Sequence, residues 1–289
     1  MQCLLLRDLM YRIRKVLNHN AIIVLAPEEK REYLILGRGV GFGRKTAERV
    51  DTRPEDTVYS LQQTSERGSA TEIVRSVNPE CLEIAGAVLD EAAKVFGKID
   101  RKILFPMADH LDFAVRRLRN GEAIRNPLNQ DIQIMFHSEY KVALCAVPML
   151  RRAFQIEISE DEIGFLALHV HTAIEDEKVS EALQTAQLVR FCISTIEQET
   201  GQSIEIMSLG YNRMMNHIRY MVTRILTKKT LQMNLNDYMK HTYPSSYAIA
   251  AKVCSELGRM MKRTVQQAEI GYLAMHIERV IEPVPPSES

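Results

Sequence analysis

The spacing of apolar and polar residues divides the chain into a short strand-forming region and a longer helix-forming region. In the first region, brief β-branched or apolar runs are separated by Asn, Pro and Gly, a pattern typical of an antiparallel meander. These runs lie at Ile13–Leu17, Ala21–Leu25, Tyr33–Leu36 and Val58–Leu61. A single small sheet has little core of its own, so we also expect it to dimerise.

Beyond residue 71, apolar positions recur every three to four residues, which indicates amphipathic helices. The segments with this periodicity are Cys81–Phe96, Arg101–Asn120, Gln130–Phe154 and Ser159–Ile174, and a similar series begins near Val179. Ser159 and Glu162 have the spacing of a capping box, so we predict that a helix begins there. The residues after Glu282, PVPPSES, are predicted to be disordered.

The helical region contains a tandem duplication. Asp161–His169 reads DEIGFLALH and Ala268–His276 reads AEIGYLAMH, with six of nine positions identical at an offset of 107 residues. The same offset relates His110 to His217, so each copy keeps two histidines 59 residues apart. We therefore predict a multidomain chain, with a small antiparallel β-sheet domain at 10–65 and two all-α helical bundles at 72–177 and 179–284.

Charge and cysteine usage narrow the class of protein. Residues 11–50 hold nine Lys/Arg and four Asp/Glu, a balance of +5, so the rest of this neutral chain carries −5. A basic module on an acidic body favours a polyanionic partner for the module. The five cysteines have no CxxC spacing, which argues against a zinc site or disulfide framework and for the cytoplasm. No apolar run approaches the ~18 residues of a membrane span, so we expect no membrane insertion.

The glycine-rich segment GRGVGFGRK, at Gly37–Lys45, matches no nucleotide-binding motif. A dinucleotide-binding fingerprint requires a glycine at the position of Phe42. A P-loop requires lysine directly after the last glycine, but Arg44 separates Gly43 from Lys45. Two interpretations remain open. The loop binds RNA, with its cations on phosphates and Phe42 stacked on a base, or it is a basic hairpin loop whose Phe is buried.

The repeated histidines admit four interpretations. Metal binding is disfavoured because His169 and His171 point about 200° apart on a helix. Acid–base catalysis is disfavoured because no carboxylate pair, nucleophile or cofactor motif accompanies them, so we expect no enzyme, no metal and no cofactor. The third interpretation is core histidines with local hydrogen bonds.

The fourth interpretation is phosphorylation of the histidines. A neutral imidazole is a nucleophile near neutral pH, and a phosphoryl group adds about −1.5 to −2 of charge. Arg117 and Arg224 lie two turns from His110 and His217, about 11 Å away along the helix. The remaining histidines are predicted to be ordinary surface or turn residues; they are His19, His137, His171 and His241.

Together the segments KVLNHNAIIV and GRGVGFGRK, followed by two His-paired helical repeats, resemble one family over about Ile13–Val280. The chain is similar to the bacterial transcriptional antiterminators of the bgl/sac type. These carry a co-antiterminator RNA-binding domain and two PTS regulation domains (PRDs). The GFG form of the glycine loop resembles the glucose-type members, and a β-glucoside or sucrose type is the alternative.

The resemblance implies a dimer of four-stranded antiparallel sheets that binds a hairpin in nascent mRNA and so prevents an overlapping terminator. Asn amides then read base edges, cations hold phosphates and Phe stacks. The RNA contacts that it implies are Lys15, Asn18, Asn20, Gly37, Arg38 and Phe42. Because Arg44 and Lys45 are positively charged, we expect them to contact phosphates as well.

The resemblance also implies phosphorylation at four histidines, which are His110, His169, His217 and His276. The implied phosphoryl donors are a sugar-specific PTS permease (EII) and the phosphocarrier HPr. Asp109 precedes the first histidine as in the family, but its counterpart is Asn216, which departs from the pattern.

Two other classes stay open. PRDs also occur in DNA-binding transcriptional activators, but those carry a helix-turn-helix, and residues 13–61 have no recognition-helix pattern. A phosphocarrier enzyme that passes phosphate onward to sugar is the second alternative.

Overall fold

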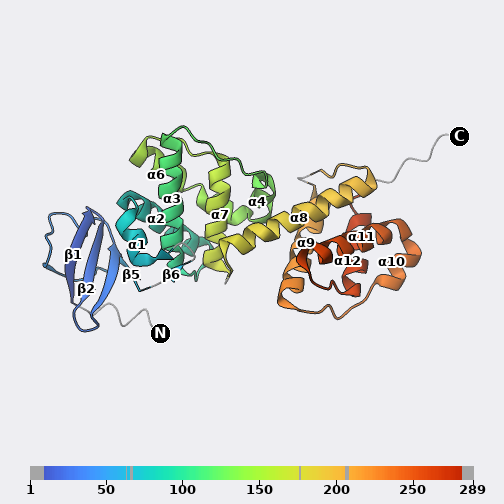
Figure 1. Cartoon of the computed structure of the whole chain (residues 1–289), viewed down its shortest axis with the longest axis horizontal. Helices are drawn as coiled ribbons and strands as arrows, with labels where there is room; N and C mark the ends of the chain where they lie inside the picture. The colour runs from blue at the N-terminus through green and yellow to red at the C-terminus, as the bar shows by residue number, and fades with distance from the viewer. Residues whose placement is uncertain (1–9, 63, 66–67, 176, 206–207, 282–289) are drawn as a thin grey trace. The chain divides into compact units, whose positions relative to one another are not determined.

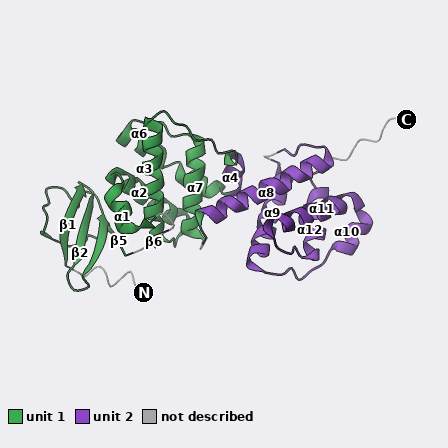
Figure 2. Cartoon of the chain, viewed as in Figure 1, with its two compact units in different colours: residues 1–129, 136–179 green, residues 130–135, 180–289 purple. Residues whose placement is uncertain are grey.

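The computed structural model describes residues 10–62, 64–65, 68–175, 177–205 and 208–281. The chain forms two compact units, drawn in two colours in Figure 2: residues 1–129 with 136–179, and residues 130–135 with 180–289. The predicted disorder after Glu282 lies outside the described residues. Within the described ranges, no helix has the length and apolar character needed to cross a bilayer.

The N-terminal region is an antiparallel sheet with strand order β4-β1-β2-β3-β5. Its strands are β1 (Tyr11–Asn18), β2 (Ala21–Ala26), β3 (Arg31–Leu36), β4 (Arg49–Val50) and β5 (Thr57–Ser60). The predicted meander is confirmed, with one addition, because the two-residue β4 is too short to leave a periodic pattern. Two further short strands, β6 (Thr64–Ser65) and β7 (Gly68–Ser69), pair with each other.

The sheet buries one compact apolar cluster. Tyr11 and Ile13 of β1 pack with Ile22 and Val24 of β2 and with Ile35 of β3. The pairing of β1 with β2 shifts register twice, between Ile13 and Lys15 and between Val16 and Asn18. Such bulges twist the strand end locally, and they leave the β1–β2 turn at residues 19–20 beside the glycine-rich loop, where the amide of Gly41 donates to the carbonyl of His19.

The first helical copy follows in the same unit (Figure 1). Its elements are α1 (Ala70–Ser76), α2 (Pro79–Phe96), the 3-10 turn η1 (Arg101–Ile103), α3 (Leu104–Arg119), α4 (Asn129–Met135), α5 (His137–Ala143), α6 (Ala146–Phe154) and α7 (Glu160–Ile174). Leu82, Leu89, Leu104 and Leu111 are fully buried, so α2 and α3 supply the centre of this core.

The helical periodicity predicted over Gln130–Phe154 is divided among three short helices, α4, α5 and α6. Phe136 has φ −120° and ψ 44°, which ends α4. Pro148 lacks the N–H that a continuous helix needs and would clash with the carbonyl of Leu144. At Ser159 the predicted start of α7 is confirmed, since its hydroxyl accepts from the amide of Glu162 at 3.4 Å.

The second unit holds the second copy, as five helices within the described residues: α8 (Val179–Thr200), α9 (Leu209–Thr227), α10 (Asn236–Thr242), α11 (Pro244–Met261) and α12 (Gln267–Glu278). Residues 130–135 of α4 also belong to this unit. There the hydroxyl of Tyr211 donates to Asp131 at 3.3 Å. The prediction of helical bundles after a small sheet is therefore confirmed.

Candidate functional site

The glycine-rich loop between β3 and β4 is held by tight turns. The amide of Val40 donates to Gly37 and the amide of Phe42 donates to Gly39, both at 3.1 Å. Gly39 and Gly43 have positive φ, 71° and 68°, which favours glycine. The side chain of Phe42 is 70% exposed, so the alternative of a buried Phe is wrong. Arg38, Arg44 and Lys45 are exposed beside it.

The β1–β2 turn and the loop form one surface. The Oδ1 atom of Asn20 accepts from the amide of Gly39 at 2.7 Å, and the Oδ1 atom of Asn18 accepts from the amide of Asn20 at 2.9 Å. A Cβ at Gly41 would overlap the carbonyl of Asn18, so only glycine permits this approach. The structure thus brings Asn18 and Asn20 against the loop that carries Phe42. Lys15 is exposed on β1.

A carboxylate of the first helical copy holds both asparagine amides. Asn18 Nδ2 donates to Glu83 Oε1 at 2.5 Å, and Asn20 Nδ2 donates to Glu83 Oε2 at 2.8 Å. Glu83 lies on α2 and is half-buried. No feature of the sequence indicated this residue, because its spacing fits any solvent-facing position of a helix.

His110 and His169, 59 residues apart in the chain, meet in the first copy. They project from α3 and α7, with ring centres 5.3 Å apart. Both are buried, at 8% and 2% exposure. The carboxylate of Glu162 lies 3.3 Å from His110 Nε2 and also pairs with Arg117. The histidines therefore share their interhelical contact with a buried ion pair.

The second copy repeats this arrangement with half-buried histidines. His217 on α9 and His276 on α12 stack with ring centres 4.5 Å apart. The Nε and Nη2 atoms of Arg224 donate to the two carboxylate oxygens of Glu269, each at 2.7 Å. Burial, His276 and Arg224 together lower the pKa of His217 to about 3. Burial, followed by Arg279 and Arg213, also lowers the pKa of His276.

Sequence reasoning missed the two glutamates. It placed Arg117 and Arg224 about 11 Å from the histidines, but each arginine binds the glutamate of the facing helix instead. The signal was present, because Glu162 and Glu269 are identical positions of the repeated nonapeptide. Each lies seven residues before a histidine and so faces the same side of its helix.

The prediction that His171 is an ordinary surface or turn residue is wrong. This side chain is 9% exposed, and its Nδ1 and Nε2 atoms lie 3.0 Å from Glu139 and 3.5 Å from Glu177. Burial alone would lower its pKa, but the two carboxylates outweigh burial and raise the pKa to about 9. His19, His137 and His241 are exposed. Among the described residues, no cluster of His, Cys, Asp or Glu is placed to hold a metal ion.

The sequence matches two family models. The PRD domain model covers residues 71–173 and 190–280, about two thirds of the chain, and the CAT RNA binding domain model covers residues 11–68. The GlcA/glcB genes antiterminator of Staphylococcus carnosus (strain TM300) is 28% identical over 92% of this chain and 94% of its own length. The beta-glucoside operon antiterminator of Dickeya chrysanthemi is 25% identical over 93% and 96%.

A crystal structure of GlcT CAT-PRDI is 25% identical and covers 57% of this chain and 98% of its own, with a TM-score of 0.48. These matched families and relatives are regulatory proteins. The chain belongs to the PRD family, with two PRD domains behind a CAT RNA-binding domain.

Proposed function

We propose that this chain is a transcriptional antiterminator of the glucose type. It binds an RNA hairpin in nascent mRNA and keeps an overlapping terminator from forming. The observation that carries this proposal is the surface made by the β1–β2 turn and the glycine-rich loop, where Phe42 is 70% exposed among exposed cations. An exposed ring stacks on an unpaired base, and the cations beside it hold phosphates.

The RNA contacts that we propose are the eight that the sequence suggested, namely Lys15, Asn18, Asn20, Gly37, Arg38, Phe42, Arg44 and Lys45; seven belong to the end of β1, the β1–β2 turn or the glycine-rich loop, and Lys15 is exposed on β1. Gly37 has an internal role as well, since a Cβ there would overlap the carboxylate of Asp56. The domain boundaries that we propose are 10–65 for the RNA-binding domain and 72–177 and 179–284 for the two PRDs.

Phosphorylation of His110, His169, His217 and His276 controls RNA binding, with a sugar-specific PTS permease and HPr as donors in the cytoplasm. The depressed pKa of His217 supports this role, because the ring stays neutral and keeps a nucleophilic lone pair at neutral pH. A phosphoryl group cannot fit between rings whose centres are 4.5–5.3 Å apart without moving the helices that carry them.

Glu83 gives this movement a route to the RNA surface. Its carboxylate occupies the amide donors of Asn18 and Asn20, which are the groups that we propose to read bases. RNA has to displace Glu83, so any shift of α2 changes RNA affinity. RNA phosphates also repel a carboxylate at this position, which makes the contact with the first PRD an obstacle to binding.

The active species is a homodimer. The sheet on its own is small, and pairing two sheets extends its buried core. Negative charge added to the PRDs on both sides of a two-fold axis places like charges opposite each other, which separates or rotates the protomers.

The direct test is binding of the full chain to an RNA hairpin taken from the leader upstream of a gene it regulates. We expect binding to the hairpin to exceed binding to duplex DNA of the same sequence and to weaken steeply with salt. Phe42→Ala lowers the affinity about tenfold through lost stacking. Tyr238→Ala, which removes a 60% exposed ring from α10, is the matched control and has no effect.

Equal binding to duplex DNA would favour the DNA-binding activator and contradict the proposal. Phosphorylation is tested with labelled phosphoenolpyruvate and purified PTS proteins. We expect the label on the four histidines, with no onward transfer to sugar. Onward transfer to a sugar would identify a phosphocarrier enzyme instead.

A further inference from the structure

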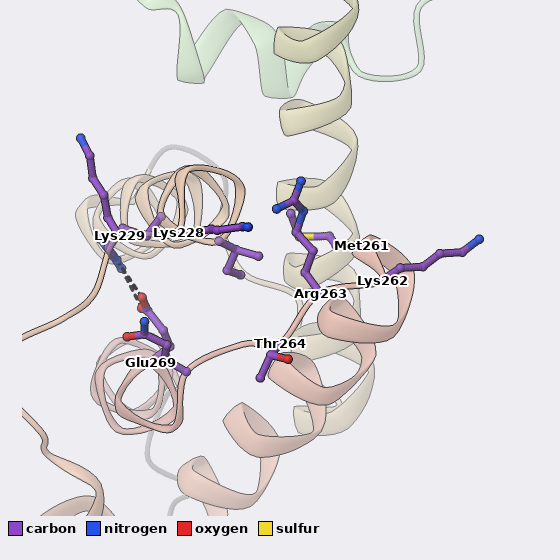
Figure 3. A pocket seen from close by; sticks show the side chains of 10 residues that line it. Lys228, Lys229, Met261, Lys262, Arg263, Thr264 and Glu269 are labelled. Carbon is purple, nitrogen blue, oxygen red and sulfur yellow. Dashed lines mark hydrogen bonds and ion pairs between the residues drawn. The ribbon is translucent and has the colours of Figure 1, made fainter.

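A cavity of about 750 Å³ lies in the second unit, where α9 and α11 end and α12 begins. Five cations line it: Arg224, Lys228, Lys229, Lys262 and Arg263. Figure 3 shows Lys228 pointing toward Arg263 across the space between them, whereas Lys229 and Lys262 extend outward at its two edges. Neither the histidine pair nor the RNA surface contributes to this cavity.

Most of the positive charge in this cavity has no carboxylate partner among the described residues. Arg224 pairs with Glu269, whereas the part of the chain that the structure describes supplies no carboxylate within ion-pair distance of the other four cations. Glu269 is the one acidic residue in the described lining. Like charges around one cavity repel each other, so this arrangement is stabilised when an anion binds among them.

The first copy shows that the fold does not require these cations. At an offset of 107, the four unpaired cations correspond to Gly121, Glu122, Gln155 and Ile156. Nearby arginines of the first copy have partners: Arg151 pairs with Glu157, and Arg119 lies over the ring of Phe154. At these four positions the first copy therefore has neutral or acidic residues, whereas the second copy has cations that line a cavity.

Two of the cations sit in a backbone conformation that suits glycine better than lysine. Lys228 has φ 56° where the first copy has Gly121 with φ 76°, and Lys262 has φ 51° where the first copy has Gln155 with φ 58°. Positive φ costs free energy for residues with a Cβ. Cations near helix C-termini are favoured by the helix dipole, but that effect does not require a lysine at the left-handed position itself.

The start of α12 adds a second feature that attracts anions. Ser159 caps α7 in the first copy, but its counterpart Gln266 makes no side-chain cap on α12. Gln266 lines the cavity. The positive end of this helix, which has no side-chain cap, therefore lies beside the four unpaired cations.

We propose that this cavity binds a small molecule that carries at least two phosphate groups. Its volume falls in the range of small-molecule sites, whereas an RNA backbone needs an extended cationic track. Lys228 and Arg263 bind one phosphate between them, and one of the lysines at the edge, Lys229 or Lys262, turns inward to reach the other. Thr264 and Gln266, also in the lining, supply polar contacts.

The site couples to the second histidine pair through one residue. Arg224 lines the cavity, binds Glu269, and contributes to the electrostatic environment of His217. A bound anion attracts Arg224 away from Glu269, which lies on the same helix as His276. Occupancy of the cavity thus changes the phosphorylation rate of this pair.

The test uses isothermal titration calorimetry of the full chain with phosphate, pyrophosphate and tripolyphosphate. We expect affinity to rise along this series and the double variant Lys228→Gly/Lys262→Gln to bind tripolyphosphate at least tenfold more weakly. The matched control is Lys30→Gly/Lys240→Gln, which removes the same charges and another lysine of positive φ, Lys30 at 52°. We expect this control variant to bind tripolyphosphate as tightly as the original chain.

Unfolding does not account for the expected loss, because Lys228→Gly relieves a left-handed lysine and leaves the melting temperature equal or higher. Unchanged tripolyphosphate binding in the cavity variant overturns the proposal. A second result also overturns it: the original chain binds none of the three phosphates, and the cavity variant loses affinity for hairpin RNA. That result would assign the cations to RNA binding. Hairpin binding by the original chain is measured in parallel, so failure here is distinct from failure of the antiterminator proposal.

Discussion

In the first helical copy the rings of His110 and His169 lie 5.3 Å apart, and in the second copy those of His217 and His276 lie 4.5 Å apart. An Arg–Glu pair accompanies each set. The copies differ in what surrounds this shared framework, because the first pair is buried and the second is half-buried. The two copies therefore share one arrangement of histidines and an Arg–Glu pair between helices, but they differ in how accessible the histidines are to a phosphoryl donor.

A neighbouring contact has changed its chemistry between the copies. His171 binds Glu139 in the first copy at 3.0 Å. At an offset of 107 these positions are Glu278 and Ser246, where the serine hydroxyl donates to the carboxylate at 2.5 Å. An ion pair that titrates near pH 9 is thus replaced by a hydrogen bond without a histidine. The two copies differ in pH response as well as in accessibility.

The largest expected difference concerns the buried Arg–Glu pairs. Glu162→Gln leaves Arg117 charged and buried, and we expect it to lower the free energy of unfolding by about 3 kcal/mol. Glu269→Gln, whose partner side chain is 20% exposed, costs about 2 kcal/mol. Urea denaturation of both variants measures the difference. Adding Arg117→Met to Glu162→Gln restores part of the loss, and equal costs in both copies would show that burial does not separate them.

The next difference is in acid stability. Unfolded histidine takes a proton near pH 6.5, whereas folded His217 takes one only near pH 3. The unfolded state binds more protons between these values, so stability falls as pH drops below 6.5. We expect the free energy of unfolding of the original chain to fall by about 2 kcal/mol between pH 6.5 and 4.5 because of His217, and we expect His217→Asn to lack this contribution. A variant as acid-sensitive as the original chain would contradict the assignment.

His171 changes stability with pH in the opposite direction to His217. Its raised pKa, about 9, means that its contribution to stability is complete below pH 6.5 and disappears as pH rises through 9. His171→Gln therefore flattens the alkaline decline in the free energy of unfolding. Denaturation at pH 6, 7.5 and 9 provides the measurement, and His137→Gln, an exposed histidine of the same unit, is the control.

Mimicking phosphorylation should separate the copies functionally. We expect His110→Asp or His169→Asp to reduce terminator read-through about tenfold in a reporter assay, because the added charge opens the first PRD. Alanine at these positions makes read-through independent of sugar. His217→Asp and His276→Asp have a smaller effect, since this pair is already half-buried. Alanine variants of the first pair that still respond to sugar would refute the assignment.

The smallest expected effect is at Glu83, the contact between the first copy and the sheet. Glu83→Gln removes the charge that opposes RNA and weakens its hold on Asn18 and Asn20. We expect hairpin affinity to rise about fivefold, or roughly 1 kcal/mol. Glu80→Gln on the same helix is the control. Unchanged affinity would show that the contact does not limit RNA binding.

Much of the fold could be predicted from local sequence patterns. Alternating apolar residues separated by turns gave the meander, and Ser159 followed by Glu162 gave the start of α7, because strand alternation and helix capping depend on neighbours in sequence. The offset of 107 identified the two histidine pairs without any structure. Over Gln130–Phe154 the periodicity predicted helix correctly, but it did not show the boundaries between three short helices, such as the one at Phe136.

The amino-acid sequence by itself determined the order of sheet and repeated helices, the glycine-rich loop with Phe42, and the four repeated histidines. Only the tertiary structure decided which groups meet: Glu162 with Arg117, Glu83 with Asn18 and Asn20, and the cations around one cavity. Periodicity says which face of a helix is apolar, but it does not specify the distant segment that this face contacts. The partners of Arg117 and of the two asparagines lie 45 to 65 residues away, so packing of the whole domain brings them together.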